Sequence, residues 1–326
     1  MIVNSESVLV SILVPVYKVE KYIEKCAMSL FEQTYDNIEY VFVDDCSPDD
    51  SIALLESIME RYPKRKEQVK IVAHEKNAGL SNARITGINN CSGLYLLNVD
   101  SDDYIERDMV EVMMKKALDS DSDMVVCDFN YVFIDKVKRM NNVVENDRLE
   151  YIASLITRHS SVCVWGRLIK KSLYVANSVY PIPDLNYAED YVVTPRLVFY
   201  AHNIVKVDRA LYNYVQSNSI SYTHNLSSIS IGNAILANDV LCDFFIKHGL
   251  HDKLPLQESK AINLVTLLYA TPLNLLSEVE SACEGLDLRD LRISLLHKCL
   301  LVLAQRKCTR LLYGILSIIN FMRNIL

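Results

Sequence analysis

The chain has 326 residues, of which 50% are apolar and 23% are charged. This balance excludes a disordered chain, and only eight Gly and eight Pro exclude a collagen-like or low-complexity one. Because 34 Lys and Arg face 41 Asp and Glu, the net charge is −7 and we expect no general affinity for nucleic acid. Nine cysteines without a CxxC pair indicate neither a disulfide framework nor a zinc site, and they favour a reducing, cytoplasmic compartment.

The first 130 residues alternate between apolar runs and stretches with helical spacing. The runs are rich in β-branched residues, as buried parallel strands require, and cover residues 8–16, 40–43, 69–73, 94–99 and 124–129. Apolar or small residues recur every three or four positions in the stretches 19–30, 52–59 and 79–87. Strands alternating with helices predict an α/β fold with a doubly wound, mostly parallel sheet, whose ligands bind beyond the carboxyl ends of the strands.

The pattern changes in the second half of the chain. A loop rich in Pro and Asn, 177–188, precedes a helical stretch that begins at Glu189. After Asn225 we expect a helical C-terminal region of three or four helices, near 229–248, 256–276, 288–305 and 307–323. The composition shift predicts two domains, 1–225 and 226–326.

Three of the predicted strands end in aromatic or acidic residues. The first ends in Pro15 and Tyr17, the second in Asp44-Asp45, and the fourth in the segment Asp100-Ser101-Asp102-Asp103. Asp residues ahead of a helix are typical of turns and caps, which is one interpretation of both acidic groups. However, three carboxylates within four residues repel one another, and a hard divalent cation, Mg²⁺ or Mn²⁺, relieves that repulsion. The sequence therefore favours a metal site after the fourth strand.

Other phosphate-binding motifs are absent from the sequence. Neither GxGxxG nor GxxxxGK[ST] occurs, which argues against a dinucleotide-binding oxidoreductase and a P-loop NTPase. A phosphatase with an aspartate nucleophile after its first strand needs a carboxylate where Pro15 and Tyr17 stand.

Five segments, in order, resemble family 2 glycosyltransferases of the GT-A-type fold. They are VSILVPVYKVE (10–20), SLFEQTY (29–35), VDDCSPD (43–49), NAGLSNAR (77–84) and GLYLLNVDSDDY (93–104). Looser signatures follow in VWGRL (164–168), AEDY (188–191), YNY (212–214) and SIS (219–221). The strong motifs cover about the first 110 residues, and the resemblance does not extend to the last hundred residues.

The resemblance implies roles for the nucleotide-binding residues. Pro15 and Tyr17 would frame the base, and Asp45 would accept a hydrogen bond from its imide N–H. Asn77 and Arg84 would face the nucleoside or the diphosphate.

The resemblance also implies a metal site and a catalytic base. Asp100 and Asp102 correspond to the family's DxD pair, with Ser101 in the same nucleotide site and Asp102 as the direct ligand of Mn²⁺ or Mg²⁺. Glu189 and Asp190 correspond to the acidic pair that supplies the base, and we assign this role to Asp190. The structural alternative for that pair is the first turn of a helix, where acidic side chains interact favourably with the helix dipole.

Three further residues leave alternatives open. His224 is a third metal ligand, a diphosphate contact or a solvated loop histidine. Trp165 stacks on a sugar ring or fills the core. The sequence departs from the family at two positions, where Lys18 replaces the usual Asn and Cys46 a common Gly.

Taken with the resemblance, these residues predict a metal-dependent glycosyltransferase. It would move a sugar from a nucleoside-diphosphate donor, expected to be a UDP-sugar, to a hydroxyl of a glycan or lipid-linked acceptor by an inverting single displacement. The alternatives are a nucleotide-sugar-binding assembly partner without turnover and a metal-dependent phosphohydrolase.

The C-terminal segment 286–326 has a charge opposite to that of the rest of the chain. It carries seven Lys and Arg against two Asp, a net +5, together with many Leu and Ile. Its last helix is expected to dock on the body of the protein or on a second subunit, or to lie in a membrane interface at the inner face of the membrane, which would suit a lipid-linked acceptor.

Overall fold

The computed structural model describes residues 8–218 and 226–325, with side chains up to Met322. The chain divides into two compact units, one of residues 1–148 and 161–219 and the other of 149–160 and 220–326. The boundary near 220 lies close to the composition shift in the sequence. The segment 149–160 belongs to the same unit as the C-terminal helices. No pattern in the sequence predicts this grouping.

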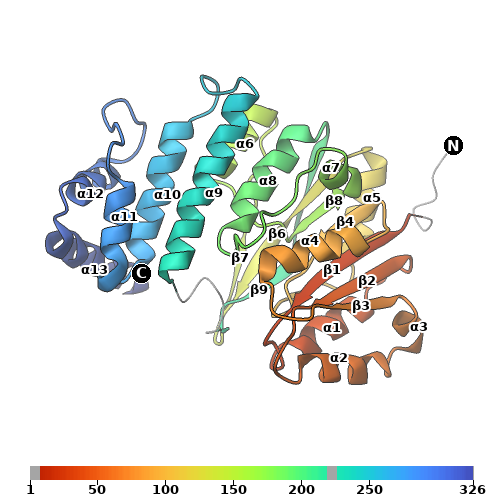
Figure 1. The fold of residues 1–326 in the computed structure, drawn as a ribbon. Helices are drawn as coiled ribbons and strands as arrows, with labels where there is room; N and C mark the ends of the chain where they lie inside the picture. The colour runs from red at the N-terminus through yellow and green to blue at the C-terminus, as the bar shows by residue number, and fades with distance from the viewer. Residues whose placement is uncertain (1–7, 219–225, 326) are drawn as a thin grey trace. The chain divides into compact units, whose positions relative to one another are not determined.

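The first unit is an α/β fold built on one sheet (Figure 1). The sheet has nine strands in the order β3-β2-β1-β4-β8-β6-β9-β5, with β7 beside β6. The strands are β1 (Val10–Val16), β2 (Ile38–Asp44), β3 (Val69–Ala73), β4 (Tyr95–Asn98), β5 (Tyr104–Ile105), β6 (Met124–Val132), β7 (Val137–Met140), β8 (Arg167–Lys170) and β9 (Ile204–Val215). The helices of this unit are α1 (Ile23–Phe31), α2 (Ser51–Met59), α3 (Pro63–Lys66), α4 (Leu80–Asn90), α5 (Met109–Asp119), α7 (Lys171–Val175) and α8 (Glu189–Tyr200).

The N-terminal half of the sheet has the predicted parallel arrangement. Strand β1 pairs in parallel with β2 on one side and β4 on the other, and all of its residues are buried. Helix α4 packs closely on this strand, because a Cβ at Gly87 would clash with the side chain of Leu13. Carboxyl ends of parallel strands meet at one edge of a sheet, so the segments after β1, β2 and β4 lie together.

The other half of the sheet is mixed. Strand β8 runs antiparallel to both β4 and β6, whereas β9 runs parallel to β6. The short strands β5 and β7 add antiparallel pairs to β9 and β6. The sequence pattern did not reveal β5, β7, β8 or β9, because they are short or carry charged residues that mask the apolar alternation.

The single tryptophan belongs to the core of this unit. Trp165 is 3% exposed and stacks on the Tyr212 ring with 4.5 Å between the centroids. It also meets Phe129 edge to face. Of the two interpretations left open, the structure supports the core residue.

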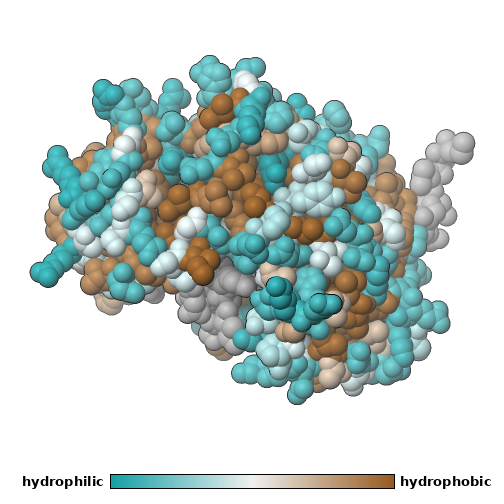
Figure 2. Space-filling model, viewed as in Figure 1, coloured by the Kyte–Doolittle hydropathy of each residue, from teal (hydrophilic) through white to brown (hydrophobic). Residues whose placement is uncertain are grey.

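The second unit consists of helices. They are α6 (Arg148–Ile156), α9 (Ser228–Lys247), α10 (Leu256–Ala270), the 3₁₀ helix η2 (Leu273–Leu275), α11 (Leu276–Ala282), α12 (Leu295–Gln305) and α13 (Thr309–Ile325). Helix α9 is long and apolar enough to cross a membrane by length and composition, and 39% of its apolar window is buried. Figure 2 shows apolar surface over α9. A buried core helix meets the same criteria, so this helix alone does not establish a membrane span.

Candidate active site

The site begins where β1 ends. Pro15 is buried next to the last residue of this strand, and Tyr17 follows the strand with a half-buried ring. The ammonium of Lys18 lies 5.0 Å from the centroid of the Tyr17 ring, within cation–π range. Both residues assigned to the nucleotide base thus stand at the edge predicted for ligand binding.

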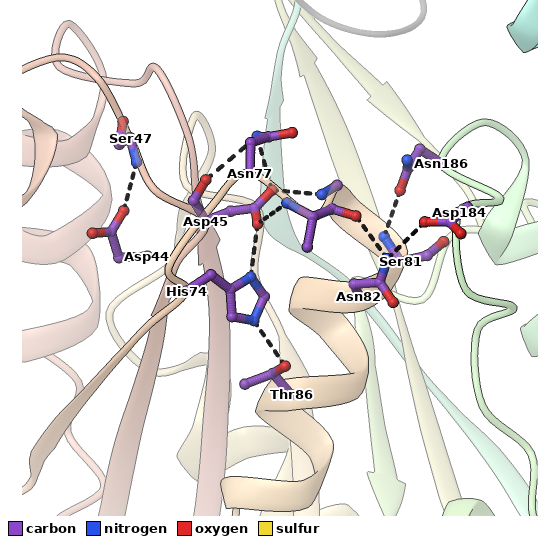
Figure 3. Close-up of polar contacts among 12 residues, drawn as sticks. Asp44, Asp45, Ser47, His74, Asn77, Ser81, Asn82, Thr86, Asp184 and Asn186 are labelled. Atoms are coloured by element: carbon purple, nitrogen blue, oxygen red, sulfur yellow. Dashed lines mark hydrogen bonds and ion pairs between the residues drawn. The ribbon is translucent and has the colours of Figure 1, made fainter.

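Asp45, after β2, is held by four donors (Figure 3). Its Oδ1 lies 2.7 Å from His74 Nδ1 and accepts from the Ala78 N–H at 2.7 Å. Its Oδ2 accepts from Asn77 Nδ2 at 3.0 Å and from the Gly79 N–H at 2.8 Å. A carboxylate offers about four lone-pair sites, so these donors occupy all of them. In this arrangement Asp45 fixes the loop 77–79, and a base imide would have to displace one of the donors.

His74 is the functional-site residue that sequence reasoning missed. The sequence analysis assigned it no role, yet its Nε2 also lies 2.9 Å from Thr86 Oγ1, so both ring nitrogens have partners. The signal was available in principle, because β3 pairs in parallel with β2 and His74 therefore follows the strand beside Asp45.

The loop 177–188 is tied to the start of α4. The Ser81 N–H donates to Asn186 Oδ1 at 3.0 Å, and Asn82 Nδ2 donates to Asp184 Oδ1 at 3.2 Å (Figure 3). Gly79 precedes the helix with φ +88, where only glycine fits without strain. These bonds bring a segment a hundred residues later in the chain to the start of α4 and the loop 77–79.

The acidic segment after β4 divides into two kinds of carboxylate. Asp103 is fully buried, and its oxygens accept from the Tyr212 hydroxyl and the Val215 N–H, both at 2.7 Å. Asp103 therefore anchors the segment to β9. Asp100 and Asp102 are half-buried, and Ser101 between them is buried.

The remaining pair, Asp100 and Asp102, has fewer partners. Asp102 Oδ2 accepts from Asn218 Nδ2 at 2.8 Å. Burial, together with repulsion from Asp100, raises the pKa of Asp102 to about 6. The described residues contain no group of three or more His, Cys, Asp or Glu arranged to hold a metal. Two carboxylates suit Mg²⁺ or Mn²⁺, which commonly complete their oxygen shell with water and substrate phosphate. His224 lies outside the described residues, as does the SIS segment.

Arg84 joins this segment to the second acidic pair. Its guanidinium is 3% exposed, with Nη2 2.9 Å from Asp100 Oδ1 and Nε 3.6 Å from Glu189 Oε1. Its Nη1 has no hydrogen-bond partner within residues 8–218 and 226–325. These three carboxyl and guanidinium groups come from α4, the segment after β4 and the start of α8, so the structure brings together residues that the sequence analysis assigned separately.

The acidic pair opens α8 in a strained setting. Ala188, just before the helix, has φ +66, a left-handed conformation that disfavours a side chain. Asp190 Oδ2 accepts from the Val164 N–H at 3.2 Å, while its Oδ1 is buried without a partner among the described residues. Burial raises the pKa of both Glu189 and Asp190, and the Arg84 charge offsets this only in part. Asp190 thus has a carboxylate oxygen free to accept a proton.

The two departures from the family pattern have the same backbone conformation. Lys18 has φ +54 and Cys46 has φ +57, both left-handed. Asn and Gly are the residues that tolerate this region best, which explains why the family uses them there. The Lys18 N–H donates to Ser47 Oγ at 2.8 Å and so links the two turns.

Comparison with known sequences identifies the family. The sequence model "Glycosyl transferase family 2" matches residues 11–175, half of the chain. The chain belongs to glycosyl transferase family 2. The match runs from the second residue of β1 to the end of α7 and, apart from Val10, includes the motifs quoted above up to residue 168.

Relatives match about two thirds of the chain. EpsH of Bacillus subtilis is 34% identical over 216 residues, which are 64% of this chain and 61% of EpsH. The glycosyltransferase GlyA of Streptococcus pneumoniae is 31% identical over 233 residues, 65% of this chain and 31% of GlyA. The chain thus spans less than two thirds of the length of either relative.

Solved structures support the fold of this family 2 member. TarS 1-349 of S. aureus in complex with UDP-GlcNAc has a TM-score of 0.60 at 22% identity, covering 92% of this chain and 88% of TarS 1-349. The mannosyltransferase PcManGT of Pyrobaculum calidifontis, in complex with GDP-Man and Mn²⁺, has a TM-score of 0.53 at 18% identity, covering 94% and 84%. The GT-A-type α/β expectation, with helices following the sheet, is confirmed.

Proposed function

We propose that this chain transfers a sugar from a nucleoside-diphosphate donor, a UDP-sugar, to a hydroxyl of a glycan or lipid-linked acceptor in the cytoplasm. The observation that carries the proposal is the Arg84 guanidinium, which lies between Asp100 of the metal-binding segment and Glu189 of the acidic pair. A donor diphosphate needs the metal-binding segment, and an acceptor hydroxyl needs the acidic pair. Arg84 contacts both of these groups. The UDP-GlcNAc bound by TarS supports the choice of UDP, and the GDP-Man bound by PcManGT makes GDP the second candidate.

The proposed reaction is a single inverting displacement. The acceptor oxygen attacks the anomeric carbon as the bond from that carbon to the diphosphate oxygen breaks, and the nucleoside diphosphate leaves with the bonding electrons. Asp190 accepts the acceptor's hydroxyl proton at its unpartnered Oδ1. The Val164 N–H orients this carboxylate, and the raised pKa makes it a stronger base than an exposed aspartate.

The nucleotide half of the site is proposed to use side chains from three strand ends. Tyr17 stacks on the base over Pro15, and Asp45 acts on the nucleotide through the loop that it fixes. The free Nη1 of Arg84 provides a donor for the diphosphate. Asp100 and Asp102 would hold Mg²⁺ or Mn²⁺, which when bound neutralises charge on the leaving diphosphate.

Nucleotide binding is tested by thermal unfolding with UDP, GDP, dTDP and CMP, each with and without Mn²⁺. A nucleotide at 100 times its dissociation constant adds about 2.7 kcal/mol to the stability of the folded state. We expect one nucleoside diphosphate to stabilise only with metal, and Asp102→Ala to abolish the effect. The matched control is Asp119→Ala, which removes an exposed carboxylate at the end of α5 and should respond like the wild type.

Turnover separates the transferase from a binding protein that lacks it. Release of nucleoside diphosphate from the donor is measured with and without acceptor hydroxyls. Asp190→Asn should lower this release about 10²- to 10⁴-fold while leaving stabilisation by the nucleotide intact. Unchanged release in Asp190→Asn would remove Asp190 as the base, and phosphate release without acceptor would favour the phosphohydrolase instead.

A further inference from the structure

The C-terminal helix α13 has two unlike faces. Leu312 and Leu316 are 0% and 2% exposed, so one face is buried in the helical unit. Asn320 on the same helix donates from Nδ2 to the Tyr269 carbonyl of α10 at 2.9 Å, which fixes the helix in place. One face is thus packed against protein, and this 17-residue helix is shorter than the ~20 residues that a membrane span needs.

The opposite face is apolar and exposed. Its large side chains are 56% to 67% exposed and are Leu311, Ile318, Phe321 and Met322. Residues 311, 318 and 322 repeat at helical spacing, and the exposed positions between them include Gly314 and Ser317. From Thr309 to Met322 the only charged residue is Arg310. The solvent face of a surface helix is normally polar or charged, so this face is unusual.

The charges around this face are basic. Arg306 and Arg310 are exposed, and neither has an acidic partner among the residues the structure describes. Lys307, between them, pairs with Glu284 at 2.8 Å. The segment 286–326 is net +5, whereas the whole chain is −7. An apolar helix face bordered by unpaired cations complements a lipid surface, whose interior is apolar and whose headgroups can be anionic.

We propose that this face of α13 lies flat in the headgroup layer of an anionic membrane. Lipid headgroups would meet Arg306 and Arg310, and the acyl boundary would cover Ile318 and Phe321. Two copies meeting through this face would bring two segments of net +5 together, and this repulsion disfavours self-association. The inference concerns a surface separate from the catalytic residues and does not depend on the transferase reaction.

The test is sedimentation of the full chain with vesicles. Vesicles of phosphatidylcholine alone are compared with vesicles containing about one third phosphatidylglycerol, an anionic lipid. The test variant is the triple substitution Leu311→Ser, Ile318→Ser and Phe321→Ser. The matched control is Ile229→Ser, Leu236→Ser and Ile246→Ser on α9, which removes three apolar side chains that are 48% to 75% exposed.

We expect the wild type to bind the anionic vesicles and to bind neutral ones much more weakly. The α13 triple should lower the partition coefficient at least about tenfold, while the α9 triple should bind like the wild type. Arg310→Gln should weaken binding about fivefold, and added salt should weaken it further. Thermal unfolding of both triples should match that of the wild type, because the substituted side chains are exposed.

Four outcomes would overturn the proposal. They are absence of wild-type binding to anionic vesicles, equal binding by the α13 triple, loss of binding by the α9 triple, and a wild-type dimer in sedimentation that the α13 triple dissociates. The third outcome would assign the membrane contact to α9, and the fourth would assign this face of α13 to a second copy of the chain.

Discussion

Replacement of Asp45 by alanine tests how the loop 77–79 is held. The variant removes the acceptor of two backbone N–H groups, those of Ala78 and Gly79, and of the Asn77 and His74 side chains. A backbone hydrogen bond to a charged acceptor contributes roughly 1.5–3 kcal/mol. Because water can reach part of this loop after the substitution, we expect a net loss of about 3 kcal/mol in the free energy of unfolding.

The assay is thermal and denaturant unfolding of the nucleotide-free protein. A loss of about 3 kcal/mol corresponds to a decrease in Tm of roughly 6–12 °C for a unit of this size. The matched control is Asp44→Ala, since Asp44 is the neighbouring carboxylate and accepts a single hydrogen bond, from the Ser47 N–H at 2.8 Å. That control should lose about 1 kcal/mol.

Equal stability of the two variants would refute this reasoning. In that case the bonds to the loop contribute nothing net, and Asp45 is a carboxylate held ready for the nucleotide base, as the family resemblance implies. If Asp45→Ala loses much stability and Asp44→Ala does not, any decrease in nucleotide affinity of Asp45→Ala would arise partly from collapse of the loop 77–79.

Four smaller predictions follow from the same structure. Burial raises the pKa of Asp190, and the Arg84 charge offsets this only in part. The acidic limb of the kcat/KM profile should therefore lie at a pH well above the ~4 of an exposed aspartate, and it should move to still higher pH in Arg84→Gln. A wild-type limb near pH ~4 would contradict the assignment of Asp190 as the base. Arg84→Met leaves buried carboxylates without their cation and should cost about 3–5 kcal/mol in denaturant unfolding, whereas a cost below about 1 kcal/mol would mean that these carboxylates are solvated. Burial raises the pKa of Asp128, but hydrogen bonds from two basic side chains outweigh burial and hold this pKa below its ordinary range. The stability that Asp128 contributes at neutral pH should therefore be lost as the pH falls below ~4. A pH-independent difference in the free energy of unfolding between wild type and Asp128→Asn would refute this. Cys46→Gly relieves a left-handed side chain and should raise stability by about 0.5–1 kcal/mol, which unchanged unfolding would exclude.

Much of the first half of the fold could be predicted from the sequence. Strands β1 to β4 form continuous apolar runs, and the helices between them keep a regular spacing, so local pattern and tertiary position agree. Because ligands bind at the carboxyl edge of a parallel sheet, the strand ends alone predict that Tyr17, Asp45 and Asp102 lie on one side of it.

The pairing of polar groups could not be predicted in the same way. Asp102 and Asp103 are adjacent in the sequence, yet Asp103 binds the Tyr212 hydroxyl and only Asp102 remains at the site. The contact between Arg84 and Glu189 joins residues more than a hundred positions apart. Such pairs depend on where β9 and α8 lie, and the short, partly charged strands of that half carry too weak a periodicity to place them.

The path of the chain between the two units constrains how this region can be exchanged between relatives. The chain passes from one unit to the other after residues 148, 160 and 219. Arg158 in the short inserted segment donates from Nε to Asn263 Oδ1 of α10 at 2.6 Å, so that segment is part of the helical unit's own bonding. A recombination event with one crossover near 220 would combine an α6 from one parent with C-terminal helices from another. To inherit a complete new helical unit, a chain therefore needs two further crossovers, one on each side of 149–160. Otherwise the residues on both sides of the Arg158–Asn263 contact must change together.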